Sequence, residues 1–183
     1  MTTIKNQRNK EEIEKLQSNM FSSDWNLVKE SARRLGELGG EEITDFLITL
    51  LDQSDSSIRD RAALALEEIR DNRAVEPLLK AIFKKENKGY TGTMVFALES
   101  HDCSQYLTDI FKIMFYQAYE CKMSAIAILD TQIFEFTTED LMEIKDMWQK
   151  CLLHPETCPE IENDEVKKEI EEAVNGYLEY LKE

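Results

Sequence analysis

The feature that most constrains this chain is one amphipathic helical pattern repeated on either side of a short polar break. The stretch runs from Ser57 to Phe83 and reads SIRDRAALALEEIRDNRAVEPLLKAIF. In each half, apolar residues recur at three- and four-residue spacing, which places them on one helix face. Pro77 has no backbone N–H, so it must lie in or near the first turn of the second helix. Asp71 is the expected cap of that turn, and the stretch is predicted to be a helical hairpin.

This hairpin resembles one unit of the HEAT-repeat family, in the short form found in bilin lyases. The family's usual glycines near the turn between the two helices are absent, and Glu67 and Arg70 stand there instead. The resemblance implies a solenoid of stacked hairpins, in a family made mostly of binding scaffolds. The positions that match the family pattern are Ile58, Arg59, Ala62, Ala63, Ala65, Leu66, Ile69, Asp71, Arg73, Ala74, Val75, Pro77 and Leu78.

An earlier copy of the unit comprises a helix expected at 25–38 and its partner at 41–51, joined by Gly39-Gly40. Val28 precedes the equivalent Ile58 by 30 positions, which is a short period for this kind of repeat. Such a hairpin cannot bury its apolar face alone, so further units should follow. Weaker versions do follow, with helices expected at 93–99, 106–117, 119–130 and 138–153. Asp102 or Ser104 is the expected cap of the helix at 106–117.

The predicted fold class is therefore all-α, a short right-handed α-α superhelix, or HEAT-like solenoid, of about four helical hairpins with capping helices. We expect one domain over residues 1–183. Its predicted parts are an N-terminal cap at 1–22, two regular repeats at 23–86, two degenerate repeats at 87–153 and a C-terminal capping helix at 160–183.

Composition and the absence of long apolar runs in the sequence indicate the compartment in which such a protein is expected. No apolar run approaches the ~20 residues of a membrane span, and the N-terminus lacks the apolar core of a secretory signal. We therefore expect a cytoplasmic protein that makes no membrane contact and keeps its four cysteines reduced.

Charge is distributed unevenly along the chain. Residues 1–90 hold 15 basic and 17 acidic side chains, whereas residues 91–183 hold 7 basic and 20 acidic ones. Nucleic-acid binding needs a positive surface, so the acidic second half argues against a nucleic-acid partner.

Three groups of residues have a composition or spacing that could support chemistry, and none is expected to be catalytic. His101 and Cys103 are two positions apart, but such neighbours in a turn point apart and Asp102 disfavours a thiolate. Cys151, His154 and Cys158 have a spacing that could bring three ligands to zinc, yet a structural site needs four. Adjacent carboxylates are most simply explained as solvated helix faces. We expect no enzyme activity, no metal and no cofactor.

Aromatic residues gather in the acidic half. Ten of the 16 Phe, Trp and Tyr residues lie between Tyr90 and Trp148, among many carboxylates. Aromatic anchors amid acidic groups are typical of a surface that binds a basic protein. The alternative interpretation is that the aromatics form core and the carboxylates serve solubility. The predicted partner-binding residues are Asp102, Asp109, Tyr116, Tyr119, Glu120, Glu135, Phe136, Glu139, Asp140 and Glu143.

These patterns favour a non-catalytic protein-binding module. Its most concrete form is an acidic immunity or inhibitor protein that occludes a basic toxin, for example a nuclease. The alternatives are a scaffold or adaptor in a larger assembly and, less favoured, a HEAT-type lyase or DNA glycosylase. A glycosylase would need a basic groove, for which the second half has the wrong sign. Oligomeric state does not follow from the sequence.

Overall fold

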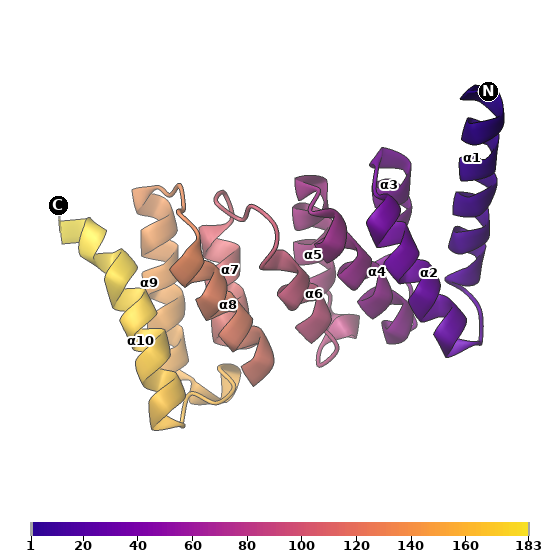
Figure 1. Cartoon of the computed structure of the whole chain (residues 1–183). Helices are drawn as coiled ribbons and strands as arrows, with labels where there is room; N and C mark the ends of the chain where they lie inside the picture. The colour runs from indigo at the N-terminus through magenta and orange to yellow at the C-terminus, as the bar shows by residue number, and fades with distance from the viewer. Residues whose placement is uncertain (1, 183) are drawn as a thin grey trace. The chain divides into compact units, whose positions relative to one another are not determined.

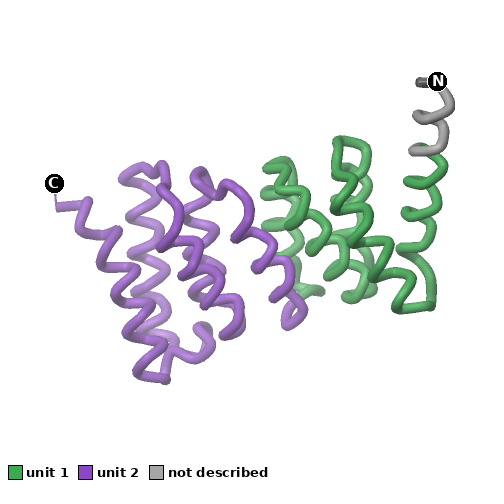
Figure 2. Tube along the Cα trace, in the orientation of Figure 1, with its two compact units in different colours: residues 1–87 green, residues 88–183 purple. Residues whose placement is uncertain are grey.

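The computed structural model describes the backbone of residues 2–182 and the side chains of residues 10–182. Over that range the regular structure consists of α-helices and short 3₁₀ helices, with no β-strand, which confirms the all-α prediction (Figure 1). The chain forms two compact units, Met1–Asn87 and Lys88–Glu183 (Figure 2). The expectation of a single domain stays a prediction.

The N-terminal unit is a row of helical hairpins preceded by one helix. In it α2 packs against α1 and α4, and α3 packs against α4. A leucine from each of the four repeat helices is fully buried, which confirms the predicted helical phase. The elements are α1 (Thr2–Asn19), α2 (Trp25–Leu38), α3 (Glu41–Leu50), α4 (Ser56–Ile69), the 3₁₀ turn η1 (Asn72–Ala74), α5 (Val75–Ile82) and the 3₁₀ turn η2 (Lys85–Asn87). The buried leucines are Leu35, Leu47, Leu66 and Leu78.

The motif arginine Arg59 has a structural role. Its side chain is buried, and one guanidinium nitrogen donates hydrogen bonds of 2.7 Å to the Gln53 carbonyl and 2.9 Å to the Ser54 carbonyl. These carbonyls belong to the turn after α3, where backbone acceptors have no helical partner. Arg59 therefore ties the end of one repeat to the first helix of the next.

The turn between α4 and α5 confirms Asp71 as a cap and places an arginine in a backbone conformation that favours glycine. Asp71 accepts a hydrogen bond of 3.1 Å from the backbone N–H of Arg73. Arg70 ends α4 with a φ of 58°, in the left-handed region that glycine adopts without steric penalty. The chain therefore keeps the family's turn with an arginine where the family has glycine.

The C-terminal unit continues the alternation of first and second helices. Here α8 packs against α6, α7 and α10, while α9 packs against α7 and α10. Because α10 follows α8 as α8 follows α6, it takes the place of the first helix of an incomplete further repeat. The elements are α6 (Gly92–Leu98), α7 (Leu107–Tyr116), α8 (Tyr119–Thr131), α9 (Thr138–Leu153), the 3₁₀ turn η3 (Pro155–Thr157), α10 (Asp164–Leu178) and the 3₁₀ turn η4 (Glu179–Lys182).

The core of this unit is aromatic. Phe111 and Phe115, one helical turn apart on α7, are fully buried. Phe115 stacks on Trp148 of α9, with ring centroids 6.0 Å apart and an angle of 19° between the planes. Part of the aromatic density seen in the sequence is therefore core packing, as the alternative interpretation expected.

The predicted cap of α7 was wrong. The residue before this helix is Tyr106, which makes no side-chain capping bond. Asp102 instead accepts a hydrogen bond of 3.0 Å from the backbone N–H of Ser104, within the loop. A turn closed by a hydrogen bond of 2.8 Å from the Tyr106 backbone N–H to the Cys103 carbonyl follows these residues, so Tyr106 takes the position before the helix.

None of the helices described over residues 2–182 is both long and apolar enough to cross a membrane.

Candidate functional site

Four predicted binding residues meet in a small pocket beside α7 and α9. The pocket has a volume of about 170 Å³, and Lys112 is the basic side chain in its lining. Lys112 Nζ lies 3.5 Å from an Asp109 carboxylate oxygen and 3.4 Å from one of Glu143. Asp109 lies on α7, Glu135 in the link before α9, and Asp140 and Glu143 on α9, so the tertiary fold assembles the cluster. We name this the Lys112 cluster; its acidic members are Asp109, Glu135, Asp140 and Glu143.

Asp140 is committed to structure within that cluster. Its Oδ2 atom accepts hydrogen bonds from the backbone N–H and the hydroxyl of Thr137, at 2.8 and 2.7 Å. Its Oδ1 atom accepts a bond of 3.3 Å from the Thr108 hydroxyl. These bonds, the Thr137 backbone bond above all, lower the pKa of Asp140. Asp140 therefore closes a capping box at the start of α9 and stays ionised.

Asp102 and Glu135 lie on two segments that the Gln132 side chain joins. Gln132 Oε1 accepts a hydrogen bond of 2.8 Å from the Cys103 backbone N–H, and its Nε2 donates 2.9 Å to the His101 carbonyl. The Glu135 backbone N–H donates a further bond of 3.0 Å to the Ser104 carbonyl. The loop before α7 and the link before α9 thus run together. Glu139 is exposed in the first turn of α9.

Tyr116, Tyr119 and Glu120 lie apart from the Lys112 cluster. They stand at the turn between α7 and α8, whereas Asp109 is in the first turn of α7. Tyr119 and Glu120 are exposed, but Tyr116 is half-buried. Burial, with smaller contributions from Cys151 and Cys158, raises the pKa of Tyr116 to about 12. The structure therefore divides the predicted patch between the two ends of α7.

A larger groove holds the remaining predicted residue, Phe136. It has a volume of about 650 Å³ and lies between α8, the link of residues 132–136 and α10. We name it the aromatic groove. The ring centroid of Tyr177 lies 5.8 Å from that of Phe136 and 6.3 Å from that of Phe134. The carboxylates that line it are Asp130, Glu169 and Glu172.

Sequence reasoning missed most of this groove because two of its walls are distant in the chain. The irregular segment Phe134–Glu135–Phe136 was a signal, since its aromatics do not follow a helical period. Tyr177 and Tyr180 lie within the range expected for the C-terminal capping helix. Nothing local shows that the link folds against that helix.

Lys122 is an unexpected buried cation. Its side chain is fully buried, and Nζ lies 3.9 Å from Cys158 Sγ. Burial lowers the pKa of Lys122. The Cys151 thiol donates a hydrogen bond to Cys158, which together with Lys122 holds the pKa of Cys158 below its ordinary range. The pair is well enclosed, because both thiols are buried.

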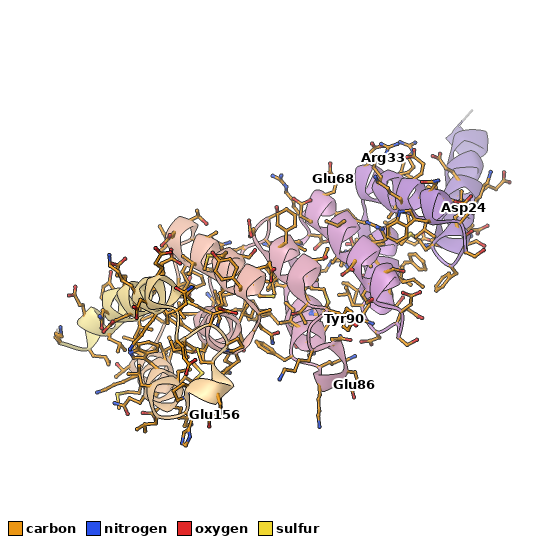
Figure 3. All side chains as sticks on the ribbon, turned by 90° about the horizontal axis from the view of Figure 1, so that it is seen from below. Asp24, Arg33, Glu68, Glu86, Tyr90 and Glu156 are labelled. Atoms are coloured by element: carbon orange, nitrogen blue, oxygen red, sulfur yellow. The ribbon has the colours of Figure 1, made fainter. Side chains whose placement is uncertain are left out.

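His154 stands away from these thiols. It is exposed, and its Nδ1 lies 3.3 Å from a Glu156 carboxylate oxygen. Figure 3 labels Glu156 on the turn after α9, among the side chains that cover the C-terminal unit. Among the residues whose side chains the structure describes, no three His, Cys, Asp or Glu side chains are grouped so as to hold a metal ion.

His101 and Cys103 are both buried, which the expected turn did not require. His101 Nδ1 lies 2.8 Å from the Ala97 carbonyl, and Cys103 Sγ lies 3.6 Å from the Leu98 carbonyl. Burial, with the Asp102 charge, raises the pKa of Cys103 to about 12. Cys103 is therefore a neutral thiol at physiological pH, which is the unreactive form.

Comparison with known proteins finds similarity to solved structures and to one family model. Two solved structures are similar in part. One, a crystal structure of computationally designed armadillo repeat proteins for modular peptide recognition, has 18% identity and a TM-score of 0.45, covering 91% of this chain and 90% of that one. The other, a designed armadillo repeat protein, has 14% identity and a TM-score of 0.31, covering 88% and 98%. No curated protein matches significantly.

The sequence itself carries the family signature. A model of HEAT repeats matches residues 13–111, more than half of the chain. The matched region includes the hairpins of α2 to α5, where the motif residues Arg59 and Asp71 make the contacts described above. This chain belongs to the HEAT-repeat family.

Proposed function

We propose that this protein is a non-catalytic binding module whose C-terminal unit binds a protein with a basic surface. Its most concrete form is an immunity or inhibitor protein that occludes a basic toxin such as a nuclease. HEAT repeats are binding scaffolds, which supports the general class. The carrying observation is the Lys112 cluster, where four carboxylates line one small pocket and two of them, Asp109 and Glu143, lie 3.5 and 3.4 Å from Lys112 Nζ.

The charge of this unit favours such a partner. Residues 88–183 hold 8 basic and 20 acidic side chains. A partner with a complementary surface would be steered toward this unit, and exposed charges act in this way over a Debye length of ~8 Å at physiological ionic strength. Tyr119, 47% exposed, offers an aromatic anchor at the other end of α7.

The test begins with capture of a partner from the native host by the full chain, followed by stopped-flow association at low and high salt. The charge-reversal variant carries Asp109→Lys, Glu120→Lys, Glu139→Lys and Glu143→Lys. Association at low salt should slow by about tenfold or more, because the steering charge is inverted. A neutralised variant with Asn and Gln at the same positions should show a smaller effect in the same direction.

The matched control reverses four exposed carboxylates of the N-terminal unit: Glu11, Glu42, Glu68 and Glu86. Circular dichroism checks that each variant keeps its helicity. Equal binding by the charge-reversal variant and wild type would refute the proposal, as would a partner that is sensitive only to the control. Inhibition of the partner's own activity at equimolar protein separates an inhibitor from a scaffold.

A further inference from the structure

The aromatic groove offers π faces and apolar surface to an incoming side chain. Phe136 and Tyr180 rings meet with centroids 5.4 Å apart, and Tyr177 meets Phe136 in a similar edge-to-face arrangement. Tyr180 is 57% exposed and Ile133 is 92% exposed at the rim. Because Tyr180 and Ile133 keep much of their surface exposed beside the half-buried Phe136 and Tyr177 rings, a partner side chain would gain apolar contact here.

The charge around the groove has one sign. Asp130, Glu169 and Glu172 line it, and no lysine or arginine does so. Lys168 lies 3.6 Å from Glu172, but both side chains are more than two-thirds exposed, so this pair is weak. Burial, with smaller contributions from Tyr180 and Asp130, raises the pKa of Tyr177 to about 12, so its hydroxyl stays neutral at physiological pH.

The α10 wall has an opening where a side chain is missing. Gly176 and Ala173 line the groove one helical turn apart. A Cβ built on Gly176 would meet nothing within 4 Å, so no packing in this unit requires a glycine there. Its φ is not in the left-handed region either, and glycine in a helix costs up to ~1 kcal/mol relative to alanine. The missing side chain leaves space on the groove side of α10.

We propose that the aromatic groove binds an arginine-bearing segment of a protein partner. The guanidinium group would stack on the Tyr177 and Phe136 rings and pair with Glu169 or Asp130, while an apolar neighbour in the segment covers Ile133. Arginine fits better than lysine because its planar group both stacks on rings and bonds carboxylates in a forked geometry. This inference rests on the proposed function and adds the residue type and the place.

The probe is a synthetic peptide with the core Leu-Arg-Phe between Gly-Ser ends, compared with versions that carry Lys or Gln in place of Arg. Each peptide is titrated into the isotope-labelled full chain and followed by NMR. The arginine peptide should shift the amide signals of Gly176, Ala173 and Ile133. The lysine peptide should bind more weakly, and the glutamine peptide should not shift these signals.

Gly176→Leu is the decisive variant, because it fills the opening while replacing a poor helix former with a good one. Melting temperature should stay equal or rise, and affinity for the arginine peptide should fall about tenfold or more. Asn175→Leu, at an exposed neighbour outside the groove, is the matched control and should bind normally. The conservative double variant Asp130→Asn with Glu169→Gln should also lower the affinity for the arginine peptide.

Three results would overturn the inference: equal affinity for the arginine and lysine peptides, signal shifts only outside the groove, or normal binding by a folded Gly176→Leu. The failure of this inference can be told apart from the failure of the proposed function. A captured basic partner that is sensitive to the Lys112-cluster reversal but not to Gly176→Leu would leave that function standing and remove this one. If the arginine peptide binds in the groove but the charge-reversal variant binds the captured partner normally, the groove inference stands and the proposed function falls.

Discussion

The Lys122 ammonium donates a hydrogen bond of 2.6 Å to the Met114 carbonyl from a fully buried side chain. A second bond of 2.9 Å reaches the Phe115 carbonyl. The last carbonyls of a helix lack intrahelical donors and carry the negative end of its dipole. Lys122 therefore serves as the cap of α7, and these bonds offset part of the cost of burying its charge.

Replacing Lys122 with methionine should keep the apolar stem and remove the donor. We expect the free energy of unfolding to fall by ~1–3 kcal/mol, because two buried carbonyls lose their lysine partner. Urea denaturation followed by circular dichroism measures this loss. Lys150→Met, at an exposed side chain, should change stability by no more than ~0.5 kcal/mol. If Lys122→Met is as stable as wild type, the cap assignment is wrong.

Leu66→Ala tests the core of the best-formed repeat. Leu66 is fully buried, so its truncation should leave a cavity and cost ~2–5 kcal/mol. Leu64, two residues earlier on α4, is 36% exposed, and Leu64→Ala should cost far less. The same denaturation experiment serves both variants. A loss below ~1 kcal/mol at Leu66 would contradict the packing described for α4.

Arg70→Gly should stabilise the protein. Arg70 holds a φ of 58°, which costs a residue with a Cβ about 1 kcal/mol relative to glycine. Part of this gain is lost to the greater freedom of glycine in the unfolded chain, so we expect a net rise of ~0.5 kcal/mol. Glu68→Gly, in the interior of α4, should instead destabilise by ~1 kcal/mol. Equal destabilisation by both glycines would disprove the strain argument.

We expect the raised pKa of Tyr177 to make the folded protein less stable at high pH. Burial raises its pKa to about 12 in the folded protein, against about 10 in an unfolded chain. Between these values the unfolded state has lost the proton and the folded state keeps it, so stability falls as pH rises. Tyr177→Phe should make the fall of melting temperature above pH ~10 shallower. Tyr90→Phe, at a 62% exposed ring, is the control. Identical slopes for wild type and Tyr177→Phe would refute this prediction.

A strong chelator should leave helicity and melting temperature unchanged. Cys151 and Cys158 are buried beside Lys122, whereas His154 is exposed next to Glu156, so the three residues do not converge on one point. Elemental analysis of the purified protein provides a second measurement. Near-stoichiometric zinc, or a clear loss of stability on chelation, would reassign these residues as ligands.

The sequence determined the kind of elements and most of their ends. Helix periodicity, the cap Asp71 and the Gly39–Gly40 turn are local signals, since each depends on residues a few positions apart. The HEAT-like motif around Arg59 indicated in addition that the hairpins stack as a solenoid. For the same reason the phase of α4, with Leu66 inward, was predictable.

Tertiary structure alone decided which distant residues meet. Eight of the ten predicted binding residues are divided among the Lys112 cluster, the aromatic groove and the turn between α7 and α8, because the link of residues 132–136 folds against both the loop before α7 and α10. The other two, Asp102 and Glu139, lie in the loop before α7 and in the first turn of α9. Lys122 shows the same limit. Three helices pack on α8, so little of it forms a solvent face, and only the end of α7 beside it makes a buried lysine favourable there. That position follows from packing between helices, which no local pattern encodes.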